Sequence, residues 1–281
     1  MYWDTLTLKG LTTRAELNGV RFEDLNNMPQ YENELRTLYN ADIRCTILSN
    51  YSSDNVLYDI FYRLNSGSVP LSTQELRQVL VRGEFANYLI EITDSVSPIQ
   101  IVLRLDGPDA RLRDVEILLR LFSFHLFGSN YEGNLKVFLD KSMKTITQEW
   151  GNYKTILPEL FRKFNMAITK LIQVFPNGNV GRKYTNSKWQ PRFNKVLFEV
   201  EVYYFTFLGD HHITDDEKQV FLRGFEVLCD SNNDFRSSIE STTKTKERYH
   251  ARFELFQELV NSSFGLSIEN NPFVLNSKPI V

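Results

Sequence analysis

Two arginines and an Asn-x-Gly loop between two predicted helices are the strongest candidate for binding chemistry in this sequence. Arg63 stands just before the loop Asn65-Ser66-Gly67-Ser68, and Arg77 follows in the next predicted helix. Backbone amides at a helix start attract phosphate, and a glycine lets the chain approach an anion closely. The pattern therefore predicts a nucleotide or phosphate site made by Arg63, Asn65, Gly67 and Arg77.

The same residues also fit a purely structural interpretation. Gly67 falls where a helix commonly ends, and Ser72-Thr73-Gln74-Glu75 forms a capping box that starts the next helix. Arg77 would then pair with Glu75 or with another acid. Helix caps far outnumber ligand sites, so both interpretations stay open.

The most apolar predicted helix, Arg111 to Phe127, carries one charged stripe. Arg113, Glu116 and Arg120 follow one another at spacings of three and four and share one line of the helix. Charges on an apolar helix are costly to bury unless they are paired. The stripe is either an internal acid–base network that supports a site, with Glu75 and Asp114 beside it, or a solvated edge with an ordinary Glu116–Arg120 pair.

A basic and aromatic segment near residue 190 is the best candidate for contact with nucleic acid. Cations can neutralise phosphates while aromatic rings stack on exposed bases. No acidic residue interrupts residues 182–195. The predicted DNA-binding residues are Arg182, Lys183, Tyr184, Lys188, Trp189 and Arg192. The alternative is a solvated basic loop.

The sequence offers few signals for catalysis or for a metal. His211 and His212 lie beside Asp210, but no spacing typical of metal ligands supports them. The motifs of serine hydrolases, P-loop proteins and dinucleotide-binding domains do not occur. The expectation is therefore no metal site and no catalytic residue.

Composition restricts the class of protein. The chain has 281 residues, a formal net charge of −3 and 21 Phe, so a core rich in large rings is expected and DNA contact must be local. Cys45 and Cys229 form no C-x-x-C pair, which is typical of a reducing compartment. No apolar run reaches the roughly 18 residues of a membrane span, and no secretory signal is recognised. A cytoplasmic protein without membrane contact is expected.

Periodicity predicts a mainly α fold with a small N-terminal β remnant (α+β) and a helical body of roughly eight to ten helices. Alternation at Leu6 and Leu8, and at Ile43, Cys45 and Ile47, favours two half-buried strands. The stretch from Ile99 to Pro108 is rich in turn residues, and 176–192 reads as a loop. The expected helices cover residues 28–39, 53–64, 72–82, 85–93, 111–127, two within 131–175, 193–208, 215–229 and 247–261.

Several stretches in order resemble the N-terminal domain family of GmrSD-type modification-dependent restriction systems, a ParB/sulfiredoxin-like group. They are LNGVRFEDL (17–25), FYRLNSGSVPLSTQELR (61–77), RLRDVEILLR (111–120), FNKVLFEV (193–200) and FRSSIESTTKTKERYHARF (235–253). The resemblance implies a phage-defence protein that hydrolyses a nucleotide, acts on DNA and often works with a separate HNH-type nuclease. The family's conserved-looking positions map onto Arg63, Asn65, Gly67, Glu75, Leu76, Arg77, Arg113, Asp114, Glu116 and Arg120.

The chain departs from the family at its N-terminus. The hallmark Asp-Gly-Gln-Gln-Arg normally precedes a phrase like TLTLKGL, and this chain begins at that phrase. The expectation is a truncated or split member, silent alone, with residues 1–95 as a ParB/sulfiredoxin-like remnant and 96–281 as a helical domain. A separate chain would supply the missing segment or a nuclease, and the ligand would be a nucleoside triphosphate with Mg. The alternatives are a standalone DNA-binding or regulatory module that uses residues 182–195, and a gene fragment.

Overall fold

The computed structural model describes residues 7–42, 70–240 and 245–269, together with residues 44, 45, 47, 49, 56, 60, 63 and 272. The chain divides into two compact units, Met1–Ser52 and Ser53–Val281. The sequence analysis placed the boundary after residue 95 instead. Helix α5 (Glu84–Thr93), which falls before that boundary, packs against α7 (Arg113–Phe127) and α8 (Leu135–Gln148) of the second unit.

The first unit is a small helical cluster. It contains η1 (Ala15–Leu17), α1 (Phe22–Asn27), η2 (Pro29–Tyr31) and α2 (Glu32–Tyr39). Leu17, Val20 and Leu25 form its buried centre. In the described part of this unit the expected N-terminal strands reduce to one antiparallel bridge between Thr7 and Arg21. Cys45 and Ile47 belong to no strand, and Ile47 is exposed, so the half-buried strand predicted at these residues does not form. Leu6 and Ile43 lie outside the described residues.

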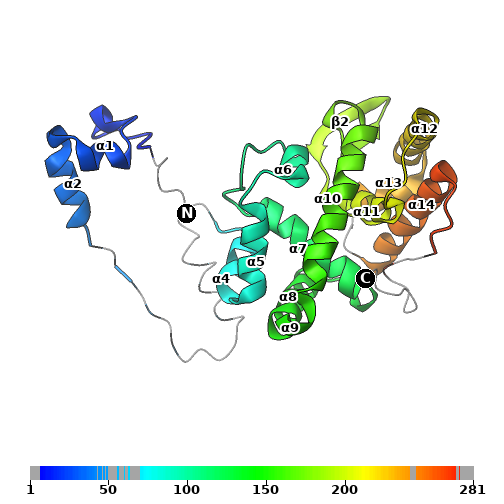
Figure 1. Ribbon diagram of the computed structural model, residues 1–281, viewed down its shortest axis with the longest axis horizontal. Coiled ribbons are helices and arrows are strands. Elements are labelled where there is room, and N and C mark those ends of the chain that lie inside the picture. Colours follow the sequence, from blue (N-terminus) through cyan, green and yellow to red (C-terminus); the bar gives the residue numbers. More distant parts are fainter. Residues whose placement is uncertain are drawn as a thin grey trace. The chain divides into compact units, whose positions relative to one another are not determined.

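The second unit confirms a mainly α fold (Figure 1). Thirteen α-helices occur in the described residues of the whole chain. Besides α5, α7 and α8, the second unit contains α4 (Thr73–Leu80), α6 (Pro98–Leu103), α9 (Trp150–Tyr153), α10 (Ile156–Val174), α11 (Lys195–Phe205), α12 (Asp215–Ser231), α13 (Asn233–Glu240) and α14 (Lys246–Phe264). Of the predicted helix 53–64, Val56, Ile60 and Arg63 are helical and the other residues lie outside the described part.

Helices α6 and α13 form outside the helix ranges that the sequence predicted, and α6 lies largely within the stretch rich in turn residues. Helix α6 starts with Pro98 in its first turn, and the Gln100 side chain accepts a hydrogen bond from the Ser97 amide at 3.0 Å. Helix α13 starts after Asn232, whose side chain accepts a hydrogen bond from the Phe235 amide at 2.9 Å. Both are short, and their caps rather than a long apolar stripe define them.

The β structure lies elsewhere than expected. Strands β1 (Arg182–Thr185) and β2 (Lys188–Phe193) form an antiparallel hairpin in the segment that was predicted to be a loop. Asn186 and Ser187 make its two-residue turn, with φ of 52° and 58°. Left-handed conformations at both central residues match the twist of a hairpin, and Asn is among the residues that tolerate them. The hairpin packs against α12 (Figure 1).

The core of the second unit is built from aromatic rings, as the composition predicts. Helix α11 is its central element, buried from Leu197 to Phe205 and packed against α7, α10 and α14. Phe122 of α7 lies 5.2 Å from the Phe164 ring of α10, and Phe124 stacks on Tyr249 of α14 at 4.9 Å between centroids. This packing fixes the positions of α7, α11 and α14, which carry the charged side chains of the candidate site.

Candidate functional site

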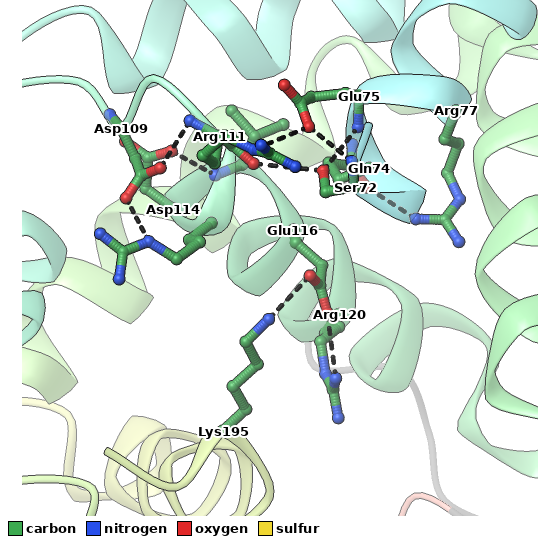
Figure 2. Close-up of polar contacts among 12 residues, drawn as sticks. Ser72, Gln74, Glu75, Arg77, Asp109, Arg111, Asp114, Glu116, Arg120 and Lys195 are labelled. Atoms are coloured by element: carbon green, nitrogen blue, oxygen red, sulfur yellow. Dashed lines mark hydrogen bonds and ion pairs between the residues drawn. The ribbon is translucent and has the colours of Figure 1, made fainter. Parts of the chain in front are cut away.

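Arg77 does not form an open phosphate site in this structure. Its side chain is 2% exposed. The Nε atom lies 2.6 Å from Asp140 Oδ1 on α8. In the second contact, Nη1 donates to Gln74 Oε1 at 2.7 Å (Figure 2). Asn65 and Gly67 lie outside the described residues, and Arg63 is helical and exposed. The structure therefore pairs Arg77 with an acid across two helices, which is the structural alternative.

Glu75 serves the start of α4. The Glu75 amide donates to Ser72 Oγ at 3.1 Å, and the Ser72 amide donates to Glu75 Oε2 at 2.5 Å, so the predicted capping box is confirmed (Figure 2). The same carboxylate lies 3.1 Å from Arg111 Nε. Glu75 thus ties α4 to the chain just before α7.

Asp114 and Arg113 hold the loop in front of α7. Asp114 is buried, and its Oδ2 accepts hydrogen bonds from the Asp109 amide at 3.0 Å and from Gln100 Nε2 at 3.2 Å. Arg113 Nε lies 2.5 Å from Asp109 Oδ2. These contacts position α7 and leave both acids occupied.

Glu116 and Arg120 belong to an internal network. Glu116 Oε2 lies 2.7 Å from Lys195 Nζ, and Glu116 Oε1 lies 3.2 Å from Arg120 Nη1 (Figure 2). Arg120 Nε also pairs with Glu199 of α11. Of the stripe, Glu116 and Arg120 belong to an internal acid–base network that includes their own i,i+4 pair, whereas Arg113 is 55% exposed and lies outside it. Burial disfavours the charge of Arg120, but Glu199, Tyr249 and Glu116 together outweigh it and raise the Arg120 pKa.

The network extends to α14 through residues that the sequence analysis did not select. Tyr249 Oη donates to Glu199 Oε2 at 3.3 Å, and the Arg252 guanidinium lies 4.1 Å from the centroid of the Tyr249 ring. Arg252 Nη1 donates to the Ser238 carbonyl at 2.7 Å. Burial lowers the pKa of Arg252. Glu199, an acid on the otherwise apolar α11, was the signal that could have revealed this part.

Arg182 is structural rather than available to DNA. The residue is 3% exposed. Its Nη1 donates to the carbonyls of Gly178 and Val180 at 2.8 and 2.9 Å, and Nη2 donates to the Val102 carbonyl of α6 at 3.3 Å. The guanidinium thus joins the hairpin to α6.

The two rings of the predicted DNA-binding segment pack inward. Trp189 stacks on Phe225 of α12 with 5.8 Å between centroids and 17° between planes, and its edge meets Phe175. Tyr184 makes an edge contact with Trp189 at 5.3 Å. Both rings pack against the core and are half-buried, so part of the ring surface that the sequence analysis expected to stack on bases is engaged inside the protein.

The cations of the hairpin and of α11 meet at one pocket of about 540 Å³, which we call the hairpin pocket. It is lined by Lys183, Arg192, Phe193, Asn194, Lys195, Val196, Ile239 and Glu240. Lys183 Nζ lies 2.6 Å from Glu240 Oε1, and Asn194 Nδ2 donates to the Ile239 carbonyl at 2.9 Å. Arg192 is exposed and forms no ion pair with a described residue. Lys188 is exposed on the same hairpin but does not line the pocket.

Acid–base and metal chemistry find little support in the described residues. Burial lowers the pKa of His125 to about 3 and raises the pKa of the Cys229 thiol to about 12, so both are neutral at physiological pH. His211 Nε2 lies 3.0 Å from Glu217 Oε1. Within the described ranges, no three His, Cys, Asp or Glu side chains gather as metal ligands would.

The buried carboxyl of Glu201 on α11 is expected to make the stability of the fold depend on pH. Its carboxyl is fully buried and accepts a hydrogen bond from the Gly181 amide at 2.8 Å, while Oε1 has no hydrogen-bond partner. Burial raises its pKa well above the ordinary value. The folded state then holds this proton more tightly than the unfolded state, so the Glu201 contribution to stability falls as pH rises above about 4.5, the unfolded pKa.

We expect Glu201→Gln to remove that pH dependence. The stability of the variant relative to the native protein should increase between pH 5 and pH 8, measured as urea midpoints at both values. Glu159→Gln, on the surface of α10, is the control and should shift in parallel with the native protein. A relative stability of Glu201→Gln that is constant with pH would show that the buried carboxyl does not titrate differently in the two states.

Comparison with family models, with curated proteins and with solved structures finds no match to this chain. The fold therefore defines only a class, a mainly helical protein with one small antiparallel hairpin. In the part of the chain that the structure describes, no helix combines the length and apolarity that crossing a bilayer requires.

Proposed function

We propose that this protein is a cytoplasmic nucleic-acid-binding module that holds backbone phosphates at the hairpin pocket. The observation that carries the proposal is the convergence of Lys183, Arg192 and Lys195, from two strands and one helix, on a single pocket. Cations placed in this way neutralise phosphates without regard to sequence. The overall charge of −3 makes the contact local.

The packing of the hairpin favours phosphate contact over base stacking. Tyr184 and Trp189 are engaged by each other and by the core, and Arg182 is buried. The cations that a polyanion can reach are the exposed Lys188 and Arg192. Two further cations, Lys183 and Lys195, line the pocket. Such a surface supports affinity and strong salt dependence rather than sequence recognition.

The family resemblance suggests the biological system in which this module would act. It supports a member of a GmrSD-type phage-defence system, and we propose that these 281 residues, which do not contain Asp-Gly-Gln-Gln-Arg, are catalytically silent alone. A separate chain with the Asp-Gly-Gln-Gln-Arg segment, or a nuclease subunit, would then perform the chemistry with a nucleoside triphosphate and Mg. Incubating the purified chain with GTP, CTP or ATP and Mg²⁺ should give no hydrolysis. A measurable rate of nucleotide hydrolysis would contradict the proposal that the chain is catalytically silent alone.

Binding of a labelled DNA duplex at 50 and 200 mM salt tests the proposed function. We expect the double variant Lys188→Ala/Arg192→Ala to bind about tenfold more weakly at the lower salt and to reduce the salt slope by about two, because two phosphate contacts are lost. The matched control, Lys154→Ala/Arg223→Ala, removes the same two charges from exposed positions away from the pocket. Equal losses in both variants, or no binding by the native chain, would refute the proposal.

A further inference from the structure

The charged network behind the hairpin pocket contains more cations than carboxylates. Among the described residues, two carboxylates, those of Glu116 and Glu199, face the three cations Lys195, Arg120 and Arg252. Glu116 is shared, because one of its oxygens meets Lys195 and the other meets Arg120 (Figure 2). Among the described residues Arg252 forms no ion pair. The network is therefore one negative charge short of balance.

Several buried arginine nitrogen atoms of this network lack a hydrogen-bond partner. Arg252 is 0% exposed, and its Nε and Nη2 atoms have no hydrogen-bond partner; Nη2 of Arg120, which is 5% exposed, has none either. Burying a charge is costly unless it is paired and hydrogen-bonded. A further negative charge near this network would therefore stabilise the fold.

Lys195 is the point at which such a charge can enter. It lines the hairpin pocket and is also the partner of Glu116, so it connects the solvent side of the pocket with the interior. Other lining residues are held by the Asn194–Ile239 hydrogen bond and by the Lys183–Glu240 pair. Ile239 and Glu240 directly follow Ser238, whose carbonyl accepts from Arg252, so the pocket lining and the interior network are joined at α13.

We infer that a phosphate group bound in the hairpin pocket completes the charge balance of the core. The phosphate pairs with Lys195, and the Glu116 carboxylate is then available to Arg120 alone. Occupancy of the pocket is thereby coupled to the stability of the α7, α11 and α14 packing. The choice of phosphate as the anion rests on the proposed function; the coupling rests on the charges and contacts of the network.

Thermal unfolding with pyrophosphate as the probe tests the coupling. Pyrophosphate is titrated at constant ionic strength, with NaCl as the balancing salt. The native chain should show a saturable rise in Tm, roughly 5 °C at a hundredfold excess over Kd. Lys195→Gln should abolish the rise, and the exposed Arg192→Ala, which cannot disturb the core, should weaken pyrophosphate binding severalfold.

Glu116→Gln separates the coupling from simple attraction between charges. The amide removes one of the two carboxylates that serve the three cations, so pyrophosphate should bind about tenfold more tightly and give a larger rise in Tm. Lys141→Gln, at an exposed position of α8, should behave as the native chain. A rise in Tm that is absent, or equal in Lys195→Gln, would overturn the inference, as would weaker binding by Glu116→Gln.

A short DNA duplex in the same assay distinguishes the two proposals. Duplex binding that depends on Lys188 and Arg192, without a Lys195-dependent response to pyrophosphate, would overturn the inference and leave the proposed function standing. A Lys195-dependent response to pyrophosphate without duplex binding would support the inference and overturn the nucleic-acid function in favour of a free phosphate compound.

Discussion

Arg77→Ala is expected to lower the free energy of unfolding by roughly 3–5 kcal/mol, as breaking a buried ion pair does. The guanidinium is buried between α4 and α8, with Asp140 Oδ1 at 2.6 Å and Gln74 Oε1 at 2.7 Å. Removing it leaves Asp140 without this partner and Gln74, which is 0% exposed, without its own. Urea denaturation followed by circular dichroism measures the loss.

Arg111→Ala is the matched control for that experiment. Its side chain is 41% exposed, and it pairs with Glu75 at 3.1 Å. We expect a cost below about 1 kcal/mol, as for other solvent-screened pairs. If Arg77→Ala kept native stability and lost only phosphate binding, Arg77 would be a ligand group as the sequence had predicted. If Arg77→Ala is destabilised as expected, a loss of phosphate binding in this variant would reflect unfolding rather than the loss of a ligand group.

Glu199→Ala is expected to cost roughly 3–5 kcal/mol for a related reason. Glu199 is 2% exposed and meets Arg120 through one oxygen and Tyr249 Oη through the other. Without it, Glu116 is the remaining carboxylate of a network with three cations. Among the described residues, the buried charges of Arg120 and Arg252 are then compensated by Glu116 alone.

A double-mutant cycle with Arg120→Met isolates that contribution. If the pair is the main interaction lost, the double variant should be less unstable than the sum of the single variants, because no buried charge is left opposite an empty site. The midpoint of guanidinium unfolding provides the measurement. Additive effects, or a Glu199→Ala cost below 1 kcal/mol, would show that Glu199 does not balance the interior charges.

Much of the helical architecture could be predicted from local patterns. The apolar stripes predict α7, α10, α12 and α14 within a few residues, and the Ser72–Glu75 capping box occurs as expected. These features depend on neighbours three or four positions apart, which the sequence places directly on one helix face. The hairpin was missed because residues 182–193 show turn and charge signals stronger than their alternation.

The sequence by itself determined which residue types the protein has for charge, capping and ring packing, and hence a mainly helical body with an aromatic core. It could not decide how each candidate side chain is used. Arg77 meets Asp140 across a separation of 63 residues, and Arg120 meets Glu199 across 79. An arginine that binds phosphate and one that neutralises a buried acid look alike locally, because only the tertiary packing sets the distance to the acid.

The same reason applies to the two candidate surfaces. Tyr184, Trp189 and Arg182 were predicted to contact DNA. In the fold, Trp189 packs on Phe175 and Phe225, Tyr184 packs on Trp189, and the Arg182 guanidinium donates to backbone carbonyls. Conversely, Lys195 and Glu116 stand far apart in sequence and meet at 2.7 Å because α11 crosses α7. Residue types predicted phosphate binding, whereas tertiary packing decided which cations line the hairpin pocket and which pair with acids in the interior.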